Sequence, residues 1–415
     1  MEQDPQYRLD AEQEKRRLAI RIVTTLALFV FPSVLISVGV PRILVNRTDQ
    51  TAVYTALALG GACGSLAGGI LSRRISMLSL LRHGISAAAV SFVLLACTPL
   101  NGIGLVFVFC AFAGITAAGV AGLTLLPLLR PASPRHTLSL SLASSALAGV
   151  AFPVIASGVF SGWAGRGVPM EGALSAGLLL TSAVLLLARI FLNGPVADSL
   201  SPASTALTRS EWKFAAIAGT LGAIHSATDN CLAYWSMLHF STSYKISAFP
   251  PAWILSGCAL AYFFTRLGLA FVPERTGGIW FLIAPGIAGA SLLWLSFSQQ
   301  SFVSAAWIYV LAAAFFGLEF PVLLGFVARM SSRCMGPVIA ISTVGAYVIC
   351  AVANPLLGSV AVRYDSAGAA IALLPLGFLA FSLLAFIAIP RRASSSKKSI
   401  DLSLDFPSTK PVRTQ

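Results

Sequence analysis

Long apolar stretches separated by short polar segments recur along the whole chain. Each stretch is about 20 residues long, the length that an α-helix needs to cross a hydrocarbon layer roughly 30 Å thick. The pattern predicts twelve such helices, over residues 19–45, 51–71, 85–100, 102–129, 138–162, 172–192, 214–240, 246–272, 278–298, 302–327, 336–362 and 367–389. We therefore expect an all-α membrane protein.

The longest polar interruption lies between the sixth and seventh spans and is rich in Ser and Pro. It divides the spans six and six, which predicts two pseudo-symmetric six-helix bundles. The predicted organisation is a tail over 1–18, a bundle over 19–193, a linker over 194–212, a second bundle over 213–390 and a tail over 391–415.

The distribution of charge predicts the orientation in the membrane. The chain is 57% apolar and 10% charged, with a net charge of +13. Most basic residues fall in the tails and in the loops that share a side with them, including Arg73, Arg74, Arg82, Arg130, Arg135, Arg209, Arg329, Arg333, Arg391 and Arg392. Only Arg42, Arg47, Arg166, Lys245 and Arg363 are assigned to the other side. Because basic loops stay in the cytoplasm, we expect both termini there, in a bacterial inner membrane, and no nucleic-acid partner.

The loop after the second span, GGILSRRIS, follows a known family pattern in part. Gly69 and Arg74 occupy its first Gly and its Arg, while Arg73 stands where the pattern has Asp. The related loop of the second half, VPERTGG, repeats part of this pattern, an acid and Arg followed after one residue by Gly, with Glu274, Arg275 and Gly277. With twelve spans split six and six, the chain resembles the major facilitator superfamily of secondary transporters.

That resemblance implies that two bundles rock about a central substrate site by alternating access. It also implies gating or conformational roles for Gly69, Arg74, Glu274, Arg275 and Gly277. Arg42, at the outer end of the first span, is expected to reach the interface; binding of an anion and closure of an outer gate by pairing with the seventh span are the alternatives.

Two acids lie deep in apolar helices, Asp229 in the seventh span and Glu319 in the tenth. A charge at a helix centre costs about 2.5–3.5 kcal/mol, so such residues tend to face a cavity or to find partners. His225 lies one helical turn before Asp229 and could share its proton. We predict proton coupling by these three residues, the alternative being ion pairs or hydrogen bonds that only lock the packing.

Other polar or aromatic side chains in the spans are candidate substrate contacts, although most such residues in membrane bundles serve helix packing. They are Ser33, Ser37, Asn230, Tyr234, Tyr262, Tyr347 and Asn354. With two buried acids and few buried bases, a cationic or neutral polar substrate is favoured over an anion.

Several function classes are excluded by missing motifs. The chain has no G-x-x-x-x-G-K-[ST] loop for ATP, no H-E-x-x-H or G-x-S-x-G signature, and seven cysteines without a C-x-x-C pair. We therefore expect no enzyme, cofactor or metal site, and a monomer. The predicted function is proton-coupled efflux of a metabolite, drug or siderophore-like compound. The alternatives are proton-coupled uptake of a sugar or small organic ion, and a transporter-like sensor or scaffold without flux.

Overall fold

The computed structural model describes residues 5–35, 47–72, 74–164, 169–192, 207–245, 249–274 and 278–389. The regular elements in these ranges are all helical: α1 (Pro5–Leu28), α3 (Arg47–Leu71), α4 (Met77–Ala96), α5 (Gly102–Leu129), α6 (Pro134–Ala164), α7 (Met170–Phe191), α8 (Arg209–Ser243), α9 (Phe249–Phe271), α10 (Trp280–Phe297), α11 (Phe302–Met330), η2 (Ser332–Cys334), α12 (Met335–Arg363), α13 (Ala367–Ile371) and α14 (Pro375–Ala388). Ten spans in the described part are long and apolar enough to cross a membrane. The 31-residue α6 and the 35-residue α8 have the length but carry more polar residues. The predicted fold class is confirmed.

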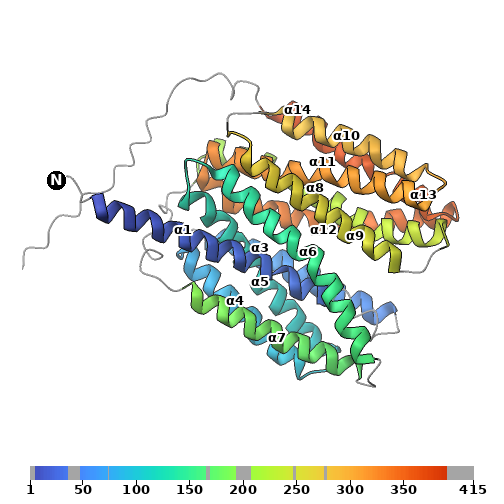
Figure 1. Ribbon diagram of the computed structural model, residues 1–415, viewed down its shortest axis with the longest axis horizontal. Helices are drawn as coiled ribbons and strands as arrows, with labels where there is room; N and C mark the ends of the chain where they lie inside the picture. Colours follow the sequence, from blue (N-terminus) through green and yellow to red (C-terminus); the bar gives the residue numbers. More distant parts are fainter. Residues whose placement is uncertain are drawn as a thin grey trace, which may run out of the picture.

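The helices lie side by side in two groups (Figure 1). The first group contains α1 and α3 to α7, drawn blue to green, and the second contains α8 to α14, drawn yellow to red. Within the groups, α5 packs against α3 and α4, and α8 packs against α12. Contacts between the groups run mainly along two helix pairs, α3 with α12 and α6 with α9.

Glycine allows α3 and α5 to approach closely in the first group. A Cβ at Gly60 would collide with the carbonyl oxygen of Phe109, and one at Gly64 with the carbonyl oxygen of Ala113. Lipid tails are as apolar as the helices, so van der Waals contact between backbones contributes much of their association. Any larger residue at these two positions would separate the helices.

The helix of the third span begins earlier than the apolar pattern predicts. It starts at Met77 rather than at residue 85, because the Ser76 hydroxyl accepts a hydrogen bond from the Ser79 N–H and caps the first turn. Arg82, expected in a loop, lies inside this helix and donates from Nη2 to the carbonyl oxygen of Leu192 at 2.8 Å. Pairing with the end of α7 explains how the helix accommodates the charge.

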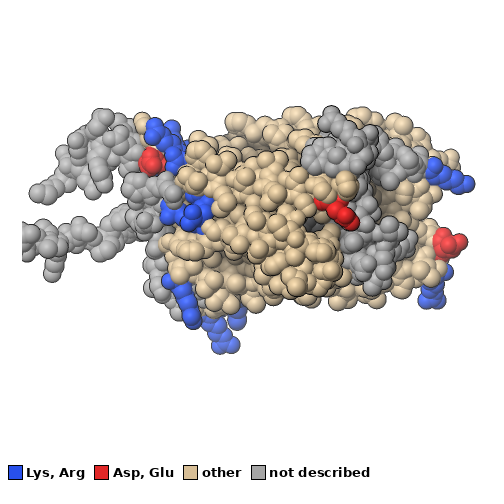
Figure 2. All heavy atoms as spheres, turned by 90° about the horizontal axis from the view of Figure 1, so that it is seen from below, with Lys and Arg blue, Asp and Glu red and all other residues tan. Residues whose placement is uncertain are grey.

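On the face that Figure 2 shows, basic side chains gather at one end of the molecule, and most of the described surface between the two ends is uncharged. We call this end the basic end; the helix ends on this side carry Arg74, Arg130, Arg135, Arg329 and Arg333. The opposite end carries Lys245 and Arg363. An uncharged belt between two charged ends is the surface that a bilayer requires.

Candidate functional site

Three polar side chains from α8 and α9 meet inside the helical bundle. The Tyr262 hydroxyl donates a hydrogen bond of 2.5 Å to Oδ1 of Asp229. Arg266 follows Tyr262 by one turn of α9, and its guanidinium carbon lies 4.8 Å from the centre of the tyrosine ring. All three side chains are half-buried. One tyrosine thus contacts both an acid and a base, and we call these residues the Asp229–Tyr262–Arg266 cluster.

Arg266 connects this cluster to both groups of helices. Its Nη1 donates to the carbonyl oxygen of Leu142 in α6 at 3.1 Å, and its Nε donates to the carbonyl oxygen of Gly317 in α11 at 3.3 Å. The absence of a side chain at Gly317 allows the close approach of α9, since a Cβ there would lie 2.5 Å from the Thr265 hydroxyl. The cluster therefore lies where a first-group helix meets two helices of the second group.

Sequence reasoning missed Arg266, although a signal was present. The residue lies six positions before the end of the predicted span 246–272, which is about 9 Å inside that span at 1.5 Å per residue. An arginine at a helix centre costs about 2.5–3.5 kcal/mol on insertion scales, and one inside a span carries part of that cost, the same argument that identified Asp229.

His225 and Glu319 form a separate, fully enclosed pair. Nδ1 of His225 lies 2.7 Å from Oε2 of Glu319, and the two residues are 4% and 0% exposed. A separation this short requires a proton between the two atoms. The histidine ring stacks on Phe320 and contacts Phe378 and Phe381 at the ring edges or at a tilt. The structure thus divides the three predicted proton-coupling residues between two environments.

The aromatic surroundings leave one oxygen of the glutamate without a partner. Oε1 of Glu319 is buried and makes no hydrogen bond to a described residue. It faces Gly286 of α10, where a Cβ would lie 2.6 Å away. Among the described residues no three His, Cys, Asp or Glu side chains gather in a way that could hold a metal ion.

The remaining candidate substrate contacts are scattered. Oδ1 of Asn354 accepts a hydrogen bond of 3.1 Å from the Trp235 indole and so joins α12 to α8. Tyr234 is 62% exposed and Asn230 is also exposed. Ser33 is half-buried in the last turns of the first span. Of the seven candidates, only Tyr262 belongs to the cluster described above.

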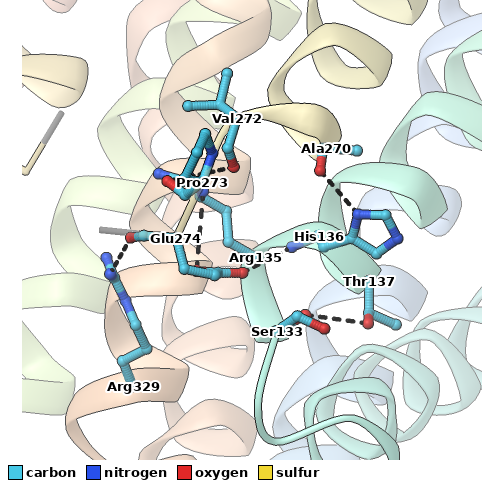
Figure 3. Close-up of polar contacts among 9 residues, drawn as sticks. All are labelled: Ser133, Arg135, His136, Thr137, Ala270, Val272, Pro273, Glu274 and Arg329. Atoms are coloured by element: carbon cyan, nitrogen blue, oxygen red, sulfur yellow. Dashed lines mark hydrogen bonds and ion pairs between the residues drawn. The ribbon is translucent and has the colours of Figure 1, made fainter. Parts of the chain in front are cut away.

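Hydrogen bonds join the two groups of helices at the basic end, where the start of α6 meets the segment that follows α9 (Figure 3). Nη2 of Arg135, at the start of α6, donates to the carbonyl oxygens of Val272 and Pro273 after α9. The backbone N–H of His136 donates to Oε1 of Glu274 at 3.1 Å, and Arg329 donates to the Glu274 carbonyl oxygen at 2.6 Å. We call Arg135, His136, Glu274 and Arg329 the α6–α9 clamp.

No protein-family model and no curated protein matches the chain. Solved structures do match. The Escherichia coli fucose:proton symporter FucP has a TM-score of 0.70 at 16% identity, with 89% of this chain and 98% of FucP covered. FucP is described as a major facilitator superfamily transporter in the outward conformation.

Two further solved structures are similar. The proton:xylose symporter XylE has a TM-score of 0.68 at 14% identity, with 91% of this chain and 96% of XylE covered. The human organic anion transporter MFSD10 has a TM-score of 0.67 at 13% identity, covering 92% and 100%. The chain has the major facilitator fold.

In this major facilitator fold the second contact between the groups, which we call the α3–α12 seam, is made by small and uncharged residues. A Cβ at Gly61 would lie 2.5 Å from the Tyr347 hydroxyl, and one at Gly69 would lie 2.6 Å from Cβ of Ala340. No ion pair joins the described residues of this seam.

Two of the residues predicted from the sequence lie in the α3–α12 seam. Gly69 lies toward the basic end, and Tyr347 lies farther along α12. Arg74 is exposed at the basic end. Four further predicted residues lie outside the described part of the chain: Ser37, Arg42, Arg275 and Gly277.

Proposed function

We propose that the protein is a secondary active transporter that couples movement of a small molecule to a proton by alternating access. The observation that carries the proposal is the Asp229–Tyr262–Arg266 cluster, an ionisable group held half-buried inside a major facilitator fold. Its Arg266 contacts both groups of helices. A change in the charge of Asp229 would alter the electrostatic environment of Arg266, and through Arg266 the contact between the two groups of helices.

We assign the proton to Asp229 and a structural role to the His225–Glu319 pair. Asp229 is half-buried and accepts one hydrogen bond, from the Tyr262 hydroxyl, so its carboxylate is not enclosed in a hydrogen-bonded acid–base pair. His225 and Glu319 are enclosed by phenylalanine rings and already share a proton. Moving one elementary charge through 100 mV supplies about 2.3 kcal/mol, a useful driving force for uphill transport.

The α6–α9 clamp supports a cycle in which the described state is closed at the basic end. With both termini in the cytoplasm, as the basic residues predict, this end would be the cytoplasmic one. The site would then load from outside, and rocking of the groups would open the α6–α9 clamp and the α3–α12 seam.

For the direction we propose uptake of proton and substrate together. Asp229 and Arg266 carry opposite charges and share Tyr262, so protonation of the acid changes the electrostatic balance at the base. FucP and XylE, which share the fold, are described as proton symporters. Efflux, which is the function predicted from the sequence, is the alternative, and it would give proton movement of the opposite sign.

Asp229→Asn tests the proton assignment. In proteoliposomes that enclose a pH-sensitive dye, wild type should acidify the interior when substrate is added, whereas the variant should give only the background signal. Glu171→Gln is the matched control, because Glu171 is an exposed acid in the first turn of α7. Unchanged proton movement in Asp229→Asn would remove the assignment, and absence of flux in every variant would favour a sensor or scaffold.

A further inference from the structure

Arg266 is a cation inside the membrane fold that has no carboxylate partner among the described residues. The ion pairs of the described chain involve Lys15, Arg17, Arg135, His225 and Arg333, but not Arg266. Its guanidinium instead contacts two carbonyl oxygens and the face of Tyr262. These contacts offset only part of the desolvation of the charge.

The hydrogen-bonding capacity of Arg266 is incompletely used. A guanidinium has five N–H donors, and the two hydrogen bonds to Leu142 and Gly317 use one donor on Nη1 and the one on Nε. Nη2 makes no hydrogen bond to a described residue, and the side chain is half-buried rather than enclosed. A planar fork of free donors is the group that best matches a carboxylate, which it can bind through two parallel hydrogen bonds.

The nearest acid can only partly neutralise this charge. Asp229 reaches the same tyrosine from α8 but lies beyond ion-pair distance of Arg266. Other titratable side chains that act electrostatically on this pair come from α8, α9 and α11. They are His225, Cys258, Tyr262, Tyr309 and Glu319. Arg266 is the one cation in this set of described residues other than a protonated His225.

We propose that Arg266 binds the negative group of the substrate, and that the substrate is a small organic anion carrying a carboxylate. While Asp229 is ionised, its charge offsets that of Arg266 across Tyr262. When Asp229 takes up a proton, the positive charge of Arg266 is left uncompensated and attracts the anion. Proton and carboxylate therefore load together, and one of each crosses without net charge. The proposal rests on the proposed function and reverses the substrate preference inferred from the sequence.

The experiment uses proteoliposomes of the full chain with a pH-sensitive dye inside. Lactate, benzoate and succinate are added separately and compared with lactamide, benzamide and succinamide, which have similar shapes without the charge. Xylose, fucose, phosphate and tetraethylammonium complete the set of probes. We expect at least one carboxylate, but not its amide, to drive protons inward faster than in protein-free liposomes, into which the neutral acid diffuses unaided.

Variants of Arg266 test the residue itself. Arg266→Gln should abolish carboxylate-driven proton flux, and Arg266→Lys should raise the KM for the carboxylate at least about tenfold while retaining part of the maximal rate, because the charge stays but the fork is lost. Arg189→Gln removes an exposed basic residue from the last turn of α7 and should leave flux unchanged. Thermal unfolding of each variant checks that it folds; if Arg266→Gln does not, the KM shift in Arg266→Lys decides.

The possible outcomes distinguish the proposal that Arg266 binds a carboxylate from the proposal of proton-coupled transport. Flux driven only by sugars, phosphate, amides or tetraethylammonium overturns the carboxylate assignment and leaves proton-coupled transport standing. Carboxylate flux that is equal in wild type, Arg266→Gln and Arg266→Lys overturns the role of Arg266 and favours a purely structural bridge between α6, α9 and α11. Absence of proton flux with every probe contradicts both proposals.

Discussion

Burial separates two kinds of ionisable residue in this protein. His225 and Glu319 are enclosed and are joined by a short hydrogen bond. Asp229 and Arg266 are half-buried and each contacts Tyr262 without forming an ion pair. A group whose charge is compensated inside the fold stabilises it, whereas one left partly uncompensated can respond to a proton or a ligand.

His225→Phe tests the structural role of the enclosed pair. Phenylalanine retains the ring contacts with Phe320, Phe378 and Phe381 but removes the hydrogen-bond partner of Glu319. We expect stability to fall by roughly 1–3 kcal/mol, the cost of leaving a buried polar group unsatisfied. Thermal unfolding of the purified protein in detergent measures the change.

The double variant His225→Phe/Glu319→Leu is the control, because replacing both partners by apolar groups should restore most of the lost stability. It should also retain substrate-driven proton flux. A stable double variant that has lost all proton flux would mean that the pair takes part in coupling.

The sequence was sufficient to find both buried acids and His225, because each interrupts an otherwise apolar stretch. It could not show that His225 turns toward Glu319, since helical spacing gives the face of a residue but not the helix that this face meets. Arg266 could have been found from its depth in the eighth predicted span. The pairing of Asp229 with Tyr262 required the structure, because these residues lie on different helices.

At the scale of single elements, a capping box fixes the start of α8 and also ties it to the segment between α11 and α12. The Thr208 hydroxyl accepts from the Glu211 N–H, and Glu211 accepts from the Thr208 N–H at 2.8 Å. The same carboxylate accepts a hydrogen bond of 3.2 Å from the Ser331 hydroxyl and lies 3.7 Å from Arg333. The backbone hydrogen bond from Thr208 is the largest cause that lowers the pKa of Glu211.

This lowered pKa predicts a pH-dependent contribution to stability. A carboxyl whose pKa is lower in the folded state stabilises the fold above its unfolded pKa of about 4.3, and the contribution disappears as pH falls through the folded pKa. Glu211→Gln should therefore be less stable than wild type at pH 7, and the difference should shrink as the pH falls below about 4.3. Thermal unfolding across this range measures the difference. Equal stability of the two proteins at pH 7 would contradict the role assigned to Glu211.

The apolar pattern was sufficient to predict that the helices exist. It could not predict where they begin and end, because the ends are set by polar contacts that the pattern does not contain. The third span begins at Met77 because of a serine cap and a long-range bond from Arg82 to α7. The last span is interrupted: α13 ends at Ile371, and α14 begins at Pro375, a residue that has no N–H to continue the first helix.

At the scale of the whole molecule, the α6–α9 clamp decides how readily the basic end opens. Glu274 connects the start of α6 with Arg329 of α11 through both its side chain and its carbonyl oxygen. Glu274→Gln keeps the size of the side chain and removes its charge beside Arg135. We expect the variant to open this end more often.

Hydrogen–deuterium exchange measures that opening. Peptides from the start of α6 and from the end of α9 should exchange faster in Glu274→Gln than in wild type, while peptides from α4 and α5 should not change. Slower or equal exchange at the start of α6 would show that the charge of Glu274 does not hold the basic end closed.

The contrast between the two interfaces has a mechanical consequence. Along α3 and α12 the groups touch through Gly61, Gly69, Tyr347 and Ala340, a surface that can slide or part without breaking an ionic contact among its described residues. Along α6 and α9 the same movement must separate arginine from glutamate. Dissolved salt weakens the second contact and leaves the first nearly untouched. Higher ionic strength on the basic side would thus loosen one of the two interfaces and ease the rocking of the two halves there, while the other interface stays unchanged.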